Sequence, residues 1–231
     1  MNAYGAFTGA LRWNLESDPR VLGLVALGSM AERGRMPDRW SDHDFFVITH
    51  EAEALRGTTE WLPHRERIAL WFRETAHGCK AVYDDAHLVE YAVFTPEELR
   101  VAKVNEYRVL FDRERIEERM AKIAQARDAS PDRDWSSGMF LSNVLVAVSR
   151  ARRGEPFSAR STLDHAMRHL VALLGGGPDD LDPLRRFDHP ALEHALHMDP
   201  VAAAREMLAI YENECGGDAS AVAAVRSAME S

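Results

Sequence analysis

One short segment constrains the fold of this chain more than any other. The apolar run Val21–Leu27 stops at Gly28-Ser29, and a second run, His43–Thr49, follows after the twelve residues from Met30 to Ser41. Short apolar runs that end at glycine or polar residues are typical of buried strands. The segment therefore predicts two strands of one sheet, joined through a Gly-Ser turn and a polar loop.

Two aspartates lie at the start of the second run. Because side chains alternate across a strand, Asp42 and Asp44 point to the same side, close enough to share a divalent cation. Two carboxylates this close repel each other unless a cation lies between them, and hard oxygen ligands suit Mg²⁺. Mg²⁺ also bridges triphosphate oxygens and can activate an attacking hydroxyl. The pair predicts a magnesium site.

The turn before this loop has the features of a phosphate-binding turn. Gly28 permits a tight turn, and Ser29 with Glu32 three residues later is typical of a capping box that starts a short helix. The amides at a helix N-terminus favour negative charge, so we expect Gly28 and Ser29 to face phosphates, with the Ser29 hydroxyl as cap or phosphate donor. Loop arginines are candidates to grip a triphosphate, unless they are merely solvated: Arg33, Arg35 and Arg39.

A third carboxylate stands in another apolar run, at residues 87–94. A buried carboxylate is costly without a partner, so Glu90 is a candidate metal ligand or general base for an acceptor hydroxyl. The alternative is a strand residue that faces solvent at a sheet edge. Asp84 and Asp85 are weaker candidates because they fall at a predicted turn.

The spacing of apolar residues predicts a mixed first part and a helical second part. Helical spacing occupies 4–17, 51–72 and 114–126, and strand-like runs occupy 79–83, 87–94 and 108–112. Beyond the polar stretch 129–134 only helical spacing remains, with the last helices expected at 200–214 and 218–230. We expect an α/β (α+β) fold, with a small mixed-sheet domain over 1–128 and a C-terminal helical bundle over 135–231.

The Gly-Ser turn, the twelve-residue loop, the Asp-x-Asp pair and the later acidic residue together resemble the DNA polymerase β-like nucleotidyltransferase superfamily, over residues 21–95. The helical part loosely resembles the substrate-side domain of the aminoglycoside and lincosamide adenylyltransferases, through Trp135, Asn143, Arg150 and residues 153–155.

This resemblance implies a function and a role for each acid. Asp42 and Asp44 would hold Mg²⁺, and Glu90, one methylene longer than the aspartate that often takes its position, would be base, metal ligand or both. The reaction would move a nucleoside monophosphate, such as AMP from ATP, to a hydroxyl of a small-molecule acceptor, for example an aminoglycoside or lincosamide. Residues 135–231 would form the acceptor-binding domain, and residues 1–128 the catalytic domain.

Composition bears on partners and compartment. A formal charge of −9 and a pI near 5.6 argue against a protein that coats a nucleic acid. Two cysteines cannot build a disulfide framework, and the longest apolar run is too short to cross a bilayer. We expect a soluble cytoplasmic protein without a membrane partner or secretory signal.

Two rival functions stay open. A relative that binds nucleotide without turnover would carry the same motif and would differ only in releasing no pyrophosphate. Arg160 and His165 also fit the Arg-x4-His pattern of HEPN-type ribonucleases, which would make the helical part RNA-cleaving. His165 and His169 have a metal-ligand spacing, as do the histidines within 189–197, and the alternative is a polar helix face with incidental histidines.

Overall fold

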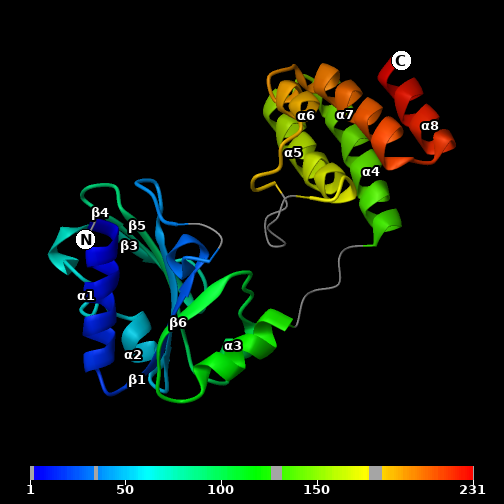
Figure 1. The fold of residues 1–231 in the computed structure, drawn as a ribbon. Helices are drawn as coiled ribbons and strands as arrows, with labels where there is room; N and C mark the ends of the chain where they lie inside the picture. The colour runs from blue at the N-terminus through cyan, green and yellow to red at the C-terminus, as the bar shows by residue number, and fades with distance from the viewer. Residues whose placement is uncertain (1–2, 34–35, 126–131, 177–183, 231) are drawn as a thin grey trace. The chain divides into compact units, whose positions relative to one another are not determined.

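The computed structural model describes residues 3–33, 36–125, 132–176 and 184–230 (Figure 1). The chain divides into two compact units, Met1–Arg127 and Asp128–Ser231. The first contains a mixed sheet with helices, and the described residues of the second form helices and their connections, so the fold is α+β. No helix within the described ranges is both long enough and apolar enough to cross a bilayer.

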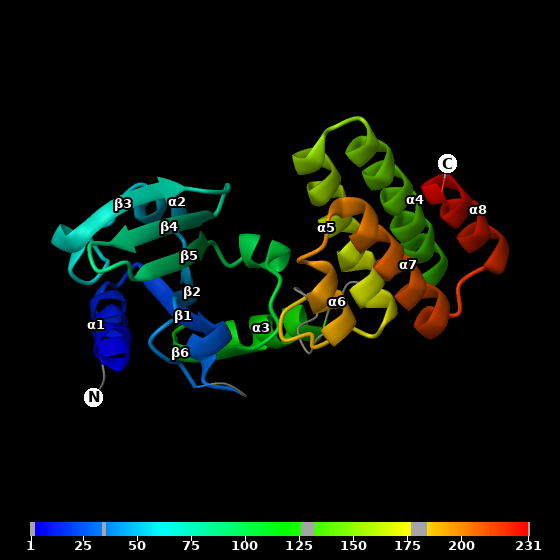
Figure 2. The same cartoon turned by 90° about the horizontal axis from the view of Figure 1, so that it is seen from above.

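The first unit is built on a six-stranded sheet. Its strands are β1 (Val21–Leu27), β2 (His43–Thr49), β3 (Ile68–Arg73), β4 (Gly78–Tyr83), β5 (Leu88–Phe94) and β6 (Tyr107–Asp112). Its helices are α1 (Ala3–Ser17), α2 (Ala52–Arg56), α3 (Ile116–Gln125) and the short 3-10 helices η1 (Gly28–Ala31), η2 (Arg65–Arg67) and η3 (Glu98–Val101). The strand order is β3-β4-β5-β2-β1-β6, in which β2 and β5 run parallel and the other neighbours antiparallel (Figure 2).

Alternation along the strands gives the sheet two different faces. On one face, α1 buries Phe7, Leu11 and Leu15 against the sheet, and α2 packs into the same core. On the other face, Ile116 and Met120 of α3 close a smaller core. This second core reaches Ile48 and Phe94, near the ends of β2 and β5, and leaves Asp44, Leu88 and Glu90, near their starts, half-exposed. The open end of this face is where the predicted acids lie.

The second unit is a helical bundle with its own core. Its helices are α4 (Arg133–Arg152), α5 (Pro156–Leu173), α6 (Pro190–Ala195), α7 (Pro200–Cys215) and α8 (Ala219–Glu230). Proline opens three of them, where its fixed φ suits the first turn. The core is formed by residues from all five helices, among them Phe140, Leu170, Leu192, Met207 and Val225.

The predicted strands are largely confirmed. β1 and β2 have the predicted bounds, and β4, β5 and β6 each begin within one residue of the expected position. The helices expected at 200–214 and 218–230 correspond to α7 and α8. Most of the polar stretch 129–134 lies outside the described residues, which resume at Asp132.

The helix predicted over 51–72 is wrong in most of its length. Only Ala52–Arg56 is α-helical, Arg65–Arg67 forms the short η2, and Ile68–Arg73 forms β3, which pairs antiparallel with β4. Gly57 follows the short helix, and Pro63 cannot continue one. The aromatic and branched residues of β3 suit a pleated surface, so pairing with β4 outweighs the helical spacing.

Candidate active site

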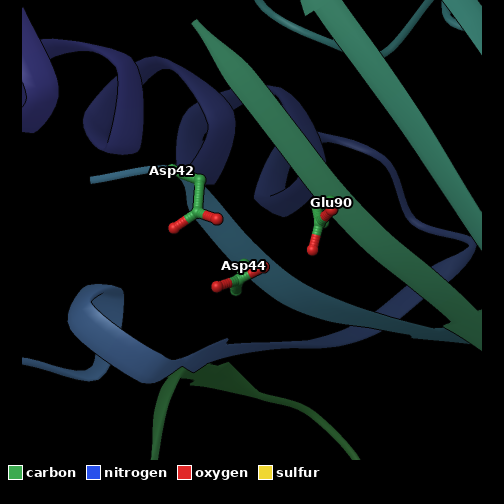
Figure 3. A group of neighbouring side chains, drawn as sticks. All are labelled: Asp42, Asp44 and Glu90. Atoms are coloured by element: carbon green, nitrogen blue, oxygen red, sulfur yellow. The ribbon is translucent and has the colours of Figure 1, made fainter. Parts of the chain in front are cut away.

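Three carboxylates meet at the half-exposed end of the sheet. Asp42 lies just before β2, Asp44 lies in β2, and Glu90 lies in β5, where the parallel register pairs it with Asp44. One oxygen of each side chain lies within 4.8 Å of the other two. Figure 3 shows the three side chains on two neighbouring strands, gathered on one face of the sheet. In the described part of the chain, no other group of three His, Cys, Asp or Glu side chains has this spacing.

The turn after β1 lies beside these acids. Gly28 has a φ of 49°, and a Cβ at this position would lie 3.3 Å from Asp44 Oδ2. Glycine therefore both permits the left-handed backbone and keeps space open next to Asp44. Ser29 is buried, and its Oγ makes no hydrogen bond of ordinary geometry with the residues described, although the Tyr4 hydroxyl lies beside it. A buried hydroxyl without a partner costs about 1–3 kcal/mol, and such groups are found at ligand sites.

The capping box predicted for Ser29 and Glu32 is wrong. η1 already begins at Gly28, and Glu32 ends it in the left-handed conformation, with a φ of 53°. From there its carboxylate pairs with Arg108, at 2.8 Å. The Ser29 hydroxyl is not used as a cap, and its donation to a phosphate stays a prediction.

The residues at this site fit a magnesium–nucleotide ligand. Mg²⁺ prefers oxygen ligands and is usually held by one or two carboxylates together with substrate phosphates. The three acids supply such oxygens, and the partnerless Ser29 hydroxyl supplies a donor for an anion. The space kept open by Gly28 lies beside Asp44.

Lys80 belongs to this site and was missed by the sequence reasoning. It lies in β4, opposite Glu90 in the antiparallel register, and its Nζ is 2.7 Å from Glu90 Oε1 and 3.0 Å from Glu74 Oε1. Hydrogen bonds to these two carboxylates raise the pKa of Lys80. The signal in the sequence was a lysine, rare among the 28 cationic residues of this chain, inside a predicted strand. One carboxylate oxygen of Glu90 is therefore paired with the ammonium group of Lys80.

A hydrogen-bonded layer supports the aspartates from the opposite face of β2. His43 is fully buried, with Nε2 3.0 Å from Thr8 Oγ1 and Nδ1 2.7 Å from His87 Nε2. The Tyr4 ring stacks on His43 with centroids 3.8 Å apart, and its hydroxyl donates to the Asp42 carbonyl oxygen at 2.9 Å. This layer ties α1 to the strand that carries the acids.

Burial keeps the layer uncharged near neutral pH. It lowers the pKa of His43 to about 3, with His87 adding to the shift, and it lowers the pKa of His87 as well. Burial also raises the pKa of Tyr4 to about 12; nearby Ser29 opposes this shift, and Asp42 and Asp44 add to it. The two histidines behind the aspartates therefore carry no positive charge near neutral pH.

The other predicted nucleotide ligands lie on the exposed loop. The Arg39 guanidinium lies 4.3 Å from the ring centroid of Trp40, and that of Arg33 lies 5.6 Å from the ring centroid of Tyr107. Arg35 lies outside the described residues. Contact between Arg39 and a triphosphate stays a prediction.

The remaining candidates take part in other contacts. Asp84 and Asp85 bind Arg67, at 2.7 and 2.9 Å, in an exposed turn. In the helical unit, Arg160 donates to the Met198 carbonyl oxygen, which makes it a structural contact, and His165 is exposed. These contacts give no support to the ribonuclease alternative.

No protein-family model matches the chain, and no curated protein matches it. Among solved structures, it is similar to an aminoglycoside 6-adenyltransferase from Bacillus subtilis, with 12% identity, 98% of this chain and 92% of that chain covered, and a TM-score of 0.36. It is similar also to a nucleotidyltransferase-like protein from Exiguobacterium sibiricum, with 13% identity, 99% and 75% covered, and a TM-score of 0.39. The function proposed below rests on the site alone.

Proposed function

We propose that this chain is a metal-dependent nucleotidyltransferase that moves a nucleoside monophosphate from a nucleoside triphosphate to a hydroxyl of a small molecule. The observation that carries this proposal is the meeting of Asp42, Asp44 and Glu90 beside the partnerless hydroxyl of Ser29. A buried donor suits an anion, whereas three carboxylates repel one. A phosphate bound through a divalent cation satisfies both.

Each residue then has a definite task. Asp42 and Asp44 hold Mg²⁺, and Gly28 and Ser29 bind phosphate oxygens. When bound, Mg²⁺ offsets the charge on those oxygens. The acceptor oxygen forms a bond to the α-phosphorus, the bond from that phosphorus to the bridging oxygen breaks, and pyrophosphate leaves. The acceptor proton passes to the carboxylate of Glu90, which Lys80 holds in position.

Pyrophosphate release tests the proposal directly. The protein is incubated with Mg²⁺, ATP and a panel of hydroxyl compounds that includes aminoglycosides and lincosamides, and other triphosphates are tried in turn. We expect at least one acceptor to raise pyrophosphate release, and Asp42→Asn to abolish the increase. Asp84→Asn is the matched control, since Asp84 pairs with Arg67 in an exposed turn.

The outcome also separates catalysis from simple binding. Mg²⁺-dependent ATP binding without pyrophosphate release, for any acceptor, would favour the non-catalytic alternative. If ATP binds as tightly in chelator as in Mg²⁺, the proposed metal dependence is refuted.

A further inference from the structure

A row of partnered residues crosses four strands on the face that carries the acids. Asp44 in β2 pairs with Glu90 in β5. Glu90 in turn pairs with Lys80 in β4, and Lys80 with Phe72 in β3. Partners in neighbouring strands share a face of the sheet. β4 and β3 therefore extend the acid-bearing face beyond Glu90 (Figure 2).

This extension is apolar and open. Leu70 and Phe72 in β3 are 53% and 42% exposed. Leu70 pairs with Val82, and Val82 pairs with Leu88, and both of these partners are half-exposed. An open sheet face usually carries polar side chains, so four neighbouring apolar ones need an explanation. We call these four residues the apolar shelf.

The phosphate turn fixes the side from which an acceptor approaches. The sheet order places β1, and with it Gly28 and Ser29, on one side of Asp44 and Glu90, and places β4 and β3 on the other. In phosphoryl transfer, the entering and leaving oxygens lie in line on opposite sides of the phosphorus. With pyrophosphate held at Ser29, the hydroxyl comes from the side of β4, and the body of the acceptor lies over the apolar shelf.

We infer that the acceptor is a hydroxyl compound with an apolar portion, and that the apolar shelf binds this portion while the hydroxyl reaches Glu90. The inference rests on the function proposed above. The composition of the shelf favours it over a polycationic acceptor, because all four side chains are apolar and Lys80, the partner of Phe72 in the register, is positively charged. An apolar group gains from leaving water over these four side chains, and none of the four offers a carboxylate to a polycation.

Two glucosides that differ only in their alkyl group test the inference. Binding of octyl and methyl β-D-glucoside, below micelle-forming concentrations, is measured by calorimetry with Mg²⁺ and a nonhydrolysable ATP analogue present. Each buried methylene strengthens binding by about fourfold, so partial burial of the octyl chain should give at least about tenfold tighter binding than methyl. The double variant Leu70→Asn, Phe72→Asn should lose this preference. Phe157→Asn in α5, where the side chain is 91% exposed, is the matched control and should keep it.

Equal affinity for the two glucosides overturns the inference, as does a preference that survives in the double variant. A change of molecular mass in the double variant shows that a second copy of the chain covers the shelf. A lower unfolding temperature shows that another part of the chain does. Both results also count against binding of an acceptor at the apolar shelf. Binding of the ATP analogue with Mg²⁺ is measured separately. If the analogue does not bind, the proposed function and this inference are both refuted. If it binds but the octyl glucoside is not preferred, only the role of the apolar shelf is refuted.

Discussion

Asp42→Asn is the most direct perturbation of the carboxylate cluster, because it removes one negative charge and keeps the shape of the side chain. The ligand oxygens lie within 4.8 Å of one another. Two unit charges at that separation repel by about 1 kcal/mol in water and by about 3.5 kcal/mol at an effective dielectric constant near 20. The side chains are half-exposed, and Lys80 offsets part of the Glu90 charge, so the lower value applies. We expect the variant to raise the free energy of unfolding of the metal-free protein by about 1 kcal/mol.

Mg²⁺ should reverse this order. A ligand that binds only the folded state adds about 1.4 kcal/mol of stability at ten times its dissociation constant. The wild-type protein should gain this amount, whereas Asp42→Asn, with one ligand oxygen replaced by an amide, should gain much less. The wild type therefore overtakes the variant as Mg²⁺ is added.

Thermal unfolding by circular dichroism, in chelator and in Mg²⁺, measures both effects. A change of 1 kcal/mol corresponds to a shift of about 3 °C in the midpoint for a chain of this size. Asp84→Asn makes the same chemical change at an exposed ion pair and should respond to Mg²⁺ as the wild type does. The reasoning is refuted if Asp42→Asn is less stable in chelator, or if it gains as much from Mg²⁺ as the wild type.

Three further predictions concern single residues. Glu90→Gln should lower turnover by about 10²–10⁴-fold with little change in nucleotide affinity if Glu90 is the base, and Glu90→Asp should lose less; unchanged steady-state turnover would place the base elsewhere. Ser29→Ala should weaken triphosphate binding by about 1–2 kcal/mol in calorimetry without lowering the free energy of unfolding, because the hydroxyl has no partner to lose; unchanged affinity would exclude it as a phosphate donor. Burial opposes ionisation of Asp112, but hydrogen bonds from the backbone N–H groups of Glu114, Ile116 and Glu117 lower its pKa below the ordinary value of 3.8. The ionised carboxylate therefore stabilises the fold above pH 3.8, and this stabilisation is lost as the pH falls through the lowered pKa. Asp112→Ala should cost about 1 kcal/mol in urea unfolding at pH 7 and less at acid pH, and an equal cost at both would contradict the assignment.

The sequence predicted those strands that have a distinct local pattern of apolar residues. β1 is a continuous apolar run, and β2 contains one at residues 45–48, and both have clear ends, which explains why their bounds agree with expectation. Glu90 was identified because an acid is unusual in such a run. Its place opposite Asp44 depends on the parallel register of β2 and β5, which no single segment encodes.

The features that were missed depend on pairing between distant segments. β3 contains a continuous apolar run, residues 68–72, but this run follows a stretch with helical spacing, and only its pairing with β4 assigns it to the edge of the sheet. A lysine in a strand is usually solvated, and the role of Lys80 follows only from its pairing with Glu90 on the neighbouring strand. The capping box failed at Ser29 because the backbone turned one residue earlier than the motif assumes.

The hydrogen bonds behind the aspartates couple the tautomers of two rings. Thr8 Oγ1 has a single proton, and both the Tyr4 carbonyl oxygen, at 3.2 Å, and His43 Nε2, at 3.0 Å, lie within hydrogen-bond distance. When that proton goes to the carbonyl oxygen, neutral His43 carries its own proton on Nε2, and its Nδ1 accepts from His87 Nε2. When it goes to His43 Nε2, the His43 proton is on Nδ1 and is donated to His87 Nε2. The two rings therefore change tautomer together. Replacement of the Thr8 hydroxyl by a methyl group would remove this link, so a helix residue on the far side of the sheet affects how the strand between the two aspartates is held.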